Sequence, residues 1–248
     1  MDRKYWERIA PAYNDEIFDV LHNDKKAIIR SAIEKIAGPG KTVLDAGCAI
    51  GKWLPVLAPA FKKVIAADIS AKNLEIAAKN YPGYANVEYL RADLSSPIIK
   101  LPKCDVTICI NAILTDSMKK RNAFFKNLSS CTRKAGYLVL TVPALESWMF
   151  SRIIQQKWNI DKKYYSDKIS GAIALKKYKN MIQGNMDLDH VPTKHYLKEE
   201  LQLLLANEGF NTLDTQKIEY DWSTEFHQPP KWLKEPKPWD WMVLAQKK

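Results

Sequence analysis

The feature that most constrains the fold of this chain is the segment 43–51, which reads Val-Leu-Asp-Ala-Gly-Cys-Ala-Ile-Gly. A short apolar run here ends in small residues at alternate positions, Gly47, Ala49 and Gly51. Residues without a bulky side chain let a ligand approach the backbone, so the pattern predicts a β-strand that leads into a nucleotide-type binding turn. An ordinary turn between a strand and a helix would look the same, and the segment by itself does not decide between the two.

The spacing of the turn excludes two well-known phosphate-binding loops. A dinucleotide fingerprint that starts at Gly47 requires glycines where this chain has Ala49 and Lys52. A P-loop requires four residues between its glycines, whereas three separate Gly47 from Gly51, and Trp53 then follows Lys52 in place of Ser or Thr. The turn therefore does not read as a phosphate cradle.

Polar residues close the next three apolar runs of the chain. Asp68 ends the first run, at 63–68, and Asp93 and Asn111 lie at the ends of the two runs that follow. Ligands of open α/β sheets bind outside the carboxyl ends of the strands, so we expect these side chains to line one crevice. Acids that merely cap the following helices would explain one or two of these positions but hardly all.

With these residues the chain resembles the class I S-adenosylmethionine-dependent methyltransferases, and the resemblance runs from residue 5 to residue 245. It implies an α/β fold: a Rossmann-like, doubly wound, seven-stranded and mostly parallel sheet with a terminal β-hairpin and a helical lid insertion. It also implies S-adenosyl-L-methionine as the cofactor and methyl transfer as the reaction.

The resemblance further implies which residues contact the cofactor. The first motif would surround the methionine part, Asp68 would hold the ribose, and an aromatic residue of the amino-terminal helix would cover the site. The chain departs from the family pattern at Ala49, which replaces the usual glycine and puts affinity in doubt more than binding itself. The expected cofactor-binding residues are Tyr13, Asp45, Gly47, Cys48, Ala49, Gly51, Asp68, Ile69, Asp93, Leu94, Asn111 and Ala112.

Helical and strand periodicities alternate along the chain, which favours a parallel sheet within a single domain, 1–248. We expect amino-terminal helices over 1–40, a cofactor-binding core over 41–143, a lid insertion over 144–192, and a carboxyl-terminal helix and hairpin over 193–248. The amino-terminal part reads as two amphipathic helices, near 4–22 and 25–37.

Composition is typical of a globular protein, and the sequence contains neither a secretory signal nor an apolar run long enough to cross a membrane. We therefore expect a cytoplasmic enzyme without membrane insertion. The cysteines show no metal-ligand or disulfide spacing, so no metal is expected. The net charge of +10 is spread along the chain, which favours a solvated basic surface over a nucleic-acid partner.

Methyl transfer needs alignment of the acceptor and sometimes a general base. His195 is our candidate base, because it precedes the last predicted helix near the carboxyl edge of the sheet; a histidine that packs against that helix is the structural alternative. Aromatic residues of the lid and of the Trp- and Pro-rich segment 222–241 could line the acceptor site, or could simply pack. The expected substrate-binding residues are Trp148, Tyr165, His195 and Trp222.

The sequence thus predicts methyl transfer to oxygen or nitrogen of a small molecule. Two alternatives stay open: an RNA or tRNA methyltransferase, suggested by the basic charge, and a non-catalytic S-adenosylmethionine-binding regulatory protein, suggested by Ala49 and by the lack of an assignable base. The acceptor, the methylated atom and the oligomeric state cannot be read from the sequence.

Overall fold

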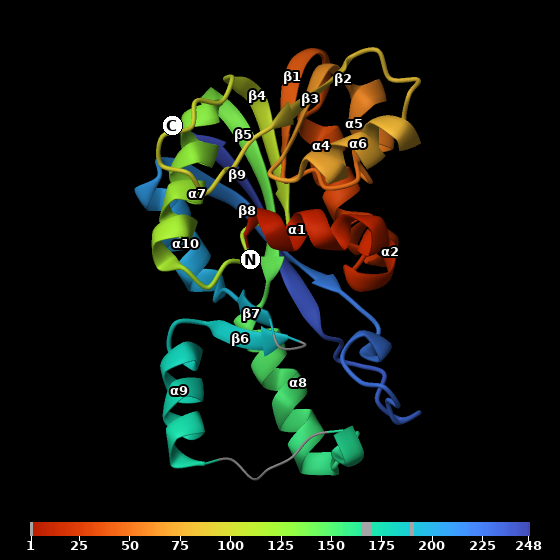
Figure 1. Ribbon diagram of the computed structural model, residues 1–248, viewed down its shortest axis with the longest axis vertical. Helices are drawn as coiled ribbons and strands as arrows, with labels where there is room; N and C mark the ends of the chain where they lie inside the picture. The colour runs from red at the N-terminus through yellow and green to blue at the C-terminus, as the bar shows by residue number, and fades with distance from the viewer. Residues whose placement is uncertain (1, 165–169, 189–190) are drawn as a thin grey trace.

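The computed structural model describes residues 2–164, 170–188 and 191–248, and its main feature is a seven-stranded sheet in the order β3-β2-β1-β4-β5-β9-β8 (Figure 1). β1 to β5 pair in parallel, and β9 runs antiparallel to both β5 and β8. The strands are β1 (Gly38–Ala46), β2 (Phe61–Asp68), β3 (Val87–Arg91), β4 (Cys104–Ile110), β5 (Thr132–Pro143), β6 (Asn185–Leu188), β7 (Val191–Lys194), β8 (Phe210–Glu219) and β9 (Trp239–Lys247).

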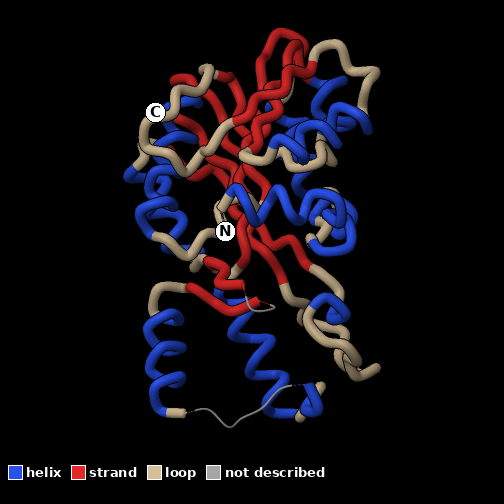
Figure 2. Tube along the Cα trace, in the orientation of Figure 1, coloured by secondary structure: helices blue, strands red, loops and turns tan. Residues whose placement is uncertain are grey.

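Helices cover both faces of this sheet, as Figure 2 shows by colour. The α-helices are α1 (Arg3–Ile9), α2 (Tyr13–Glu16), α3 (Val20–Asn23), α4 (Ile28–Ile36), α5 (Leu54–Ala60), α6 (Ala71–Asn80), α7 (Met118–Cys131), α8 (Leu145–Trp158), α9 (Gly171–Met181) and α10 (Lys198–Asn207). Short 3₁₀ helices are η1 (Ala10–Ala12), η2 (Lys162–Tyr164) and η3 (Trp222–Thr224). The predicted doubly wound sheet with its terminal hairpin is confirmed.

Alternation along the strands builds two separate cores, one on each face of the sheet. Leu44 of β1 faces a cluster that contains residues of α7 and α10, whereas its neighbour Val43 faces a cluster that contains residues of α4, α5 and α6. Both side chains are fully buried. A parallel sheet is stable only when both faces are covered, which explains why the central strands read as continuous apolar runs.

The strand order reverses at β1, which lies between β2 and β4. From β1 the chain continues through α5 to β2, which pairs with one edge of β1, whereas β4 pairs with the other edge. The carboxyl ends of β1 and β4 therefore diverge at a topological switch point, where open α/β sheets bind their ligands.

The chain leaves the sheet at Pro143 and forms an insertion, residues 145–194, that contains α8, η2, α9 and the two-stranded sheet β6–β7. In Figure 1, α8 continues from β5 away from the sheet, and α9 lies beyond β6. Ile160 of this insertion shares a cluster with Trp222, Phe226 and Leu233 of the connection between β8 and β9. The Trp- and Pro-rich segment therefore packs on the insertion, as its structural interpretation predicted.

Two local expectations differ from the structure. The helix expected over 4–22 is divided into α1, η1, α2 and α3, because Pro11 lacks the backbone N–H of a continuous helix and Asp19 starts a new one by accepting a hydrogen bond from His22 N at 2.9 Å. The segment expected to be a helical lid also contains the hairpin β6–β7, so the expected boundary at residue 192 falls inside β7.

None of the helices in the described ranges has the length and the apolar character that crossing a membrane requires.

Candidate functional site

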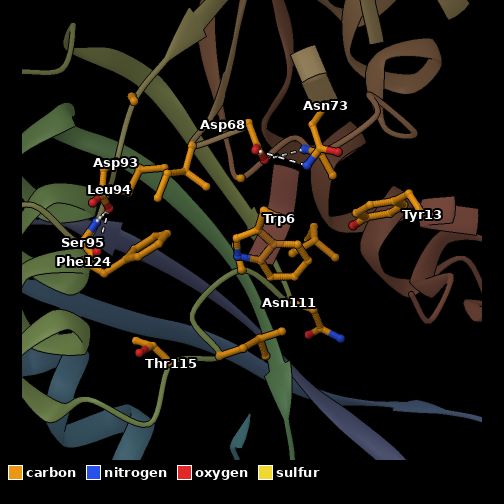
Figure 3. Close-up of a pocket in the computed structure, with 17 residues that line it drawn as sticks. Trp6, Tyr13, Asp68, Asn73, Asp93, Leu94, Ser95, Asn111, Thr115 and Phe124 are labelled. Atoms are coloured by element: carbon orange, nitrogen blue, oxygen red, sulfur yellow. Dashed lines mark hydrogen bonds between the residues drawn. The ribbon is translucent and has the colours of Figure 1, made fainter. Parts of the chain in front are cut away.

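A pocket that opens to solvent lies at the carboxyl edge of the sheet, beside the switch point. Figure 3 shows side chains converging on it from the strand ends and from the amino-terminal helices. The lining residues are Trp6, Tyr13, Gly47, Ala49, Asp68, Ile69, Asn73, Ala92, Asp93, Leu94, Ser95, Ile110, Asn111, Ala112, Leu114, Thr115 and Phe124.

The turn after β1 forms the floor of this pocket, and its backbone takes the left-handed conformation at three residues. The φ angles are +86° at Gly47, +48° at Ala49 and +82° at Gly51. A Cβ atom on Gly47 would lie 2.5 Å from the Cβ of Ala112, and one on Gly51 would lie 2.8 Å from Leu54 Cδ1. The two glycines are therefore required both by backbone conformation and by close packing, whereas Ala49 adopts a strained conformation.

Asp68, at the end of β2, holds this turn in place. Its Oδ2 accepts a hydrogen bond from Ala49 N at 2.9 Å, and its Oδ1 accepts bonds from Ser70 N at 2.8 Å and from Asn73 Nδ2 at 3.3 Å. The residue is 6% exposed, and this burial raises the pKa of its carboxyl although the hydrogen bonds act in the opposite direction. Asp68 thus couples the turn after β1 to the start of α6.

Asp45 lies beneath the turn as a buried acid, and no cationic side chain among the described residues offsets its charge. Burial, and secondarily the negative charge of Asp68, raises its pKa from 3.8 to about 7. Its Oδ2 has no hydrogen-bond partner in the described structure. A buried acceptor of this kind is costly unless a donor or a cation reaches it.

The loop after β3 provides the opposite wall of the pocket. Asp93 Oδ1 accepts hydrogen bonds from Ser95 N at 2.9 Å and from Ser95 Oγ at 2.6 Å, shown as dashed lines in Figure 3. Asn127 of α7 donates to Leu94 O at 2.8 Å and to Ser96 O at 2.9 Å. The loop is therefore fixed by its own turn and by α7.

The amino-terminal helices cover the pocket, with Trp6 and Tyr13 in its lining (Figure 3). Glu7 anchors this cover, because its carboxylate accepts hydrogen bonds from Ala71 N at 3.0 Å and Lys72 N at 3.2 Å in the first turn of α6. A carboxylate at a helix amino terminus also interacts favourably with the helix dipole. Burial raises the pKa of Tyr13, so its phenol keeps its proton and is a hydrogen-bond donor.

Asn111, just after β4, contributes the amide at the end of the pocket beneath Trp6 in Figure 3. Its backbone is left-handed, with φ +47°, a conformation that asparagine tolerates better than most residues. Its Nδ2 donates to Asp240 Oδ2 at 2.7 Å, and its Oδ1 is buried with no hydrogen-bond partner within the ranges that the structure describes.

Of the cofactor-binding residues expected from the sequence, the structure brings nine to the pocket wall: Tyr13, Gly47, Ala49, Asp68, Ile69, Asp93, Leu94, Asn111 and Ala112. Asp45, Cys48 and Gly51 do not line it. They lie behind the turn, where Cys48 is 5% exposed and packs in the core on the α4 side of the sheet.

Sequence reasoning missed other lining residues, including Trp6, Asn73, Thr115 and Phe124. Asn73 lies five residues after Asp68 on the first turn of α6, a spacing that could have identified it. Trp6 and Phe124 had no comparable signal, because each lies on a helix whose apolar side chains read equally well as core.

The structure does not bring His195 to the pocket, so its interpretation as the general base is not supported. The side chain is 5% exposed, and its Nδ1 lies 3.1 Å from Thr193 O, a bond that the ring nitrogen donates. Burial lowers its pKa to about 4, which keeps the ring neutral. His195 therefore lies buried between β7 and α10 in the chain, with its ring bonded to the backbone of β7.

The expected substrate-binding residues are also outside the pocket lining. Trp148 is half-buried on α8 beneath Arg152, whose guanidinium carbon lies 5.9 Å from the ring centroid. Trp222 is 4% exposed and stacks on Phe226, with ring centroids 5.3 Å apart. Tyr165 lies outside the described residues.

The charged side chains in the described wall of the pocket are all acidic. The described residues that line it include two carboxylates, Asp68 and Asp93, and no lysine, arginine or histidine. Phosphate groups require cationic or backbone N–H partners, whereas this wall offers mainly acceptors. The pocket therefore suits a ligand with hydroxyl or ammonium donors and positive charge.

Comparison with known proteins agrees with this arrangement. Residues 43–136 match the model of a family described as "Methyltransferase domain". No curated protein sequence gave a significant match.

Solved structures similar to this fold cover nearly the whole chain. The magnesium protoporphyrin IX methyltransferase ChlM from Synechocystis PCC 6803, solved with bound SAH, is 18% identical with a TM-score of 0.59, over 99% of this chain and 97% of that chain. The N-methyltransferase NodS from Bradyrhizobium japonicum WM9, in complex with S-adenosyl-L-homocysteine, is 10% identical with a TM-score of 0.64, over 99% and 97%. DhpI, in the complex DhpI-SAM-HEP, is 14% identical with a TM-score of 0.64, over 99% and 95%.

The family match covers the strands and turns that build the pocket, and the structural similarity covers the sheet, the terminal hairpin and the insertion. Residues 43–136 therefore match a methyltransferase domain, and the fold of the whole chain is similar to that of solved methyltransferases that bind S-adenosylmethionine or S-adenosylhomocysteine.

Proposed function

We propose that the pocket binds S-adenosyl-L-methionine and that the chain transfers its methyl group to oxygen or nitrogen of a small-molecule acceptor. The observation that carries this proposal is the acceptor-rich pocket wall without a basic side chain in its described lining. S-adenosylmethionine has a sulfonium, an ammonium and ribose hydroxyls, and it has no phosphate.

The described residues fit such a ligand at its positively charged end. One acceptor of the pocket wall, Oδ1 of Asn111, is buried and has no hydrogen-bond partner among the described residues. Gly47 leaves space where a Cβ atom would collide with Ala112, so a ligand can approach the backbone of the turn. A ligand donor that fills this unsatisfied acceptor would remove a cost of about 1–3 kcal/mol.

The remaining walls suit the nucleoside part. Asp68 ends β2 and faces the pocket, and a carboxylate in this place can accept bonds from both ribose hydroxyls. Leu94 and Phe124 provide an apolar surface for the adenine ring, and Asp93 lies beside them.

When bound, the cofactor supplies the methyl group as an electrophile for in-line displacement. The described pocket lining contains no histidine, lysine or cysteine that would act as a base. We therefore expect the chain to act by alignment and by exclusion of water beneath the cover of Trp6 and Tyr13. Such positioning can lower a barrier by roughly 7–11 kcal/mol in well-oriented systems.

Two alternatives have their own support. The net charge of +10 is compatible with an RNA acceptor, which would show as affinity that falls steeply with salt. The strained Ala49, together with a pocket lining free of an imidazole among the described residues, favours a non-catalytic binding protein. Cofactor binding without turnover on a broad acceptor panel would support the second alternative.

The direct test is calorimetric titration of the purified chain with S-adenosylmethionine, S-adenosylhomocysteine and ATP. ATP shares the adenosine but has phosphates in place of the cationic end, so we expect the first two to bind at least tenfold more tightly than ATP. Asp68→Ala should weaken the binding of S-adenosylmethionine and of S-adenosylhomocysteine at least tenfold. Circular dichroism checks that the variant is folded. Absence of binding by the wild type, or ATP binding as tight as that of the cofactor, would contradict the proposal.

A further inference from the structure

A buried hydrogen-bond network connects the pocket to the terminal hairpin of the sheet. Asn111 at the pocket donates through Nδ2 to Asp240 Oδ2 at 2.7 Å, and the hydroxyl of Tyr220 donates to the same oxygen at 2.9 Å. Asp240 is the second residue of β9, after Trp239, and Tyr220 follows the end of β8. Asp240 is 8% exposed and Tyr220 is 5% exposed.

This network decides which way the Asn111 amide points. A carboxylate accepts hydrogen bonds and cannot donate them, so the group of Asn111 that faces Asp240 must be the NH₂. The carbonyl oxygen Oδ1 then points to the other side, where it is buried and has no hydrogen-bond partner in the described part of the chain. Asn111 itself belongs to the pocket wall. The acid on β9 therefore fixes an unsatisfied acceptor at the pocket.

The partner of this acceptor must be a donor. At the methionine end of S-adenosylmethionine only the ammonium offers N–H groups, since the sulfonium has none. Resting on the function proposed above, we infer that Asp240 and Tyr220 are positioning residues that orient Asn111 Oδ1 to bind the ligand's ammonium group. Asn111 makes the contact, and the two hairpin residues act through it.

The position of Tyr220 extends the network to the cover of the pocket. Its ring packs edge to face against Phe18, with centroids 4.5 Å apart. Phe18 lies between α2 and α3, in the amino-terminal segment that also brings Tyr13 to the pocket. The ring of Tyr220 thus contacts the cover segment while its hydroxyl holds Asp240, so removal of the hydroxyl alone leaves the packing intact.

The test compares three ligands in calorimetric titrations: S-adenosylmethionine, S-adenosylhomocysteine and 5′-methylthioadenosine, which retains the nucleoside and sulfur but lacks the ammonium-bearing end. Asn111→Ala and Asp240→Asn should each weaken the first two at least tenfold and change methylthioadenosine binding less than twofold. Tyr220→Phe should show the same selectivity with a loss of about threefold, because Asp240 keeps its bond from Asn111. Tyr137→Phe, on β5, is the matched control and should change none of the three.

The ligand series separates positioning from a merely structural role. A collapsed pocket would weaken all three ligands equally, and that result, or unchanged binding of all three by Asp240→Asn, would overturn the inference. If wild-type protein binds methylthioadenosine but neither amino-acid-bearing ligand, the inference fails together with the proposed function. The inference is supported if the wild type binds S-adenosylmethionine and the variants lose affinity only for the two ligands that carry the amino-acid end.

Discussion

Asp68 and Ala49 are joined by a hydrogen bond of 2.9 Å, from the backbone N–H of Ala49 to Oδ2 of Asp68. This bond ties the end of β2 to a residue that has a left-handed backbone, with φ +48°. A residue other than glycine in this left-handed conformation costs roughly 1–2 kcal/mol. The hydrogen bond therefore stabilises a turn that the side chain of Ala49 disfavours.

Substitution of Ala49 tests this balance. Ala49→Gly keeps the N–H donor and relieves the strain, so the free energy of unfolding should change by less than about 1 kcal/mol and cofactor binding should persist. Ala49→Val places a β-branched residue in the same conformation and at the pocket surface, so it should destabilise the protein by about 1–3 kcal/mol and weaken binding more than tenfold. Urea denaturation and calorimetry measure the two effects; equal behaviour of both variants would contradict the assigned strain.

Gly47 and Gly83 form a second pair for comparison. A methyl group on Gly47 would meet Ala112 Cβ at 2.5 Å in a backbone with φ +86°, whereas one on Gly83 would meet nothing within 4 Å. Gly47→Ala should lower the free energy of unfolding by about 1–3 kcal/mol and reduce cofactor affinity more than tenfold. Gly83→Ala should leave both within error, and a neutral Gly47→Ala would mean that the turn has room to relax.

The cover of the pocket should loosen when its anchor is removed. Glu7→Gln replaces the carboxylate that accepts from Ala71 N and Lys72 N by a neutral amide, which weakens both bonds and the interaction with the helix dipole. We expect cofactor dissociation to become about three- to tenfold faster, with less than about 1 kcal/mol lost in stability. Stopped-flow displacement measures the rate, with Glu16→Gln on α2 as the control. An unchanged dissociation rate would show that α1 is held by other contacts.

Asp45 should make stability depend on pH. Burial raises its pKa from 3.8 to about 7, so between these values the unfolded chain releases a proton that the folded chain keeps. The free energy of unfolding therefore falls as pH rises through this window, by up to about 1.4 kcal/mol per pH unit, and the loss is complete above pH 7.

Asp45→Asn should flatten that dependence, measured by urea denaturation at several pH values. Asp240 acts in the same direction over a lower window, since burial raises its pKa to about 6. The comparison is therefore sharpest between pH 6 and pH 7, above the range of Asp240. His195, whose pKa burial lowers from 6.5 to about 4, acts in the opposite direction, but it is present in both proteins, so the difference between the two slopes reports Asp45. Identical slopes for wild type and Asp45→Asn would contradict the assignment.

Lys194 and Glu200 join the insertion to α10. Lys194 Nζ is buried and lies 2.7 Å from Glu200 Oε1 and 3.0 Å from Gln183 O. Glu200→Gln would remove the counter-charge of the buried ammonium and should destabilise the protein by about 1–3 kcal/mol. A fully buried pair would lose more, but the Glu200 side chain is 34% exposed. Glu199→Gln, exposed on the same turn, should cost less than about 0.5 kcal/mol. Thermal unfolding of the two variants measures the difference, and equal midpoints would show that water already satisfies Lys194.

Local sequence patterns were sufficient to predict the sheet and the pocket residues that follow its strands. Residues such as Leu44 and Val43 alternate between the two cores, so the strand period alone indicates a sheet covered on both faces. Gly47 and Asp68 follow their strands directly, and the carboxyl ends of parallel strands meet at one edge. Their meeting needs no information beyond strand order, although the cofactor roles assigned to them remain a proposal.

His195 illustrates where this reasoning fails. Proximity to the carboxyl edge was inferred from its place before α10, and its neighbour Tyr196 does donate its backbone N–H to Pro143 O at the end of β5. The direction of the imidazole, however, depends on the hairpin β6–β7, because His195 N donates to Gly184 O and the ring bonds to Thr193 O. A sequence pattern that places a residue at an edge does not determine where its side chain points.

What the sequence by itself determined is the architecture of the sheet and the turn after β1, because burial periodicity and the steric freedom of glycine act over a few neighbouring residues. What only the tertiary structure decided is the closure of the pocket and the orientation of its polar groups. Asn111 and Asp240 are 129 residues apart, and Glu7 meets α6 across 64 residues. Contacts at such separations depend on how distant elements pack, and no local period encodes them.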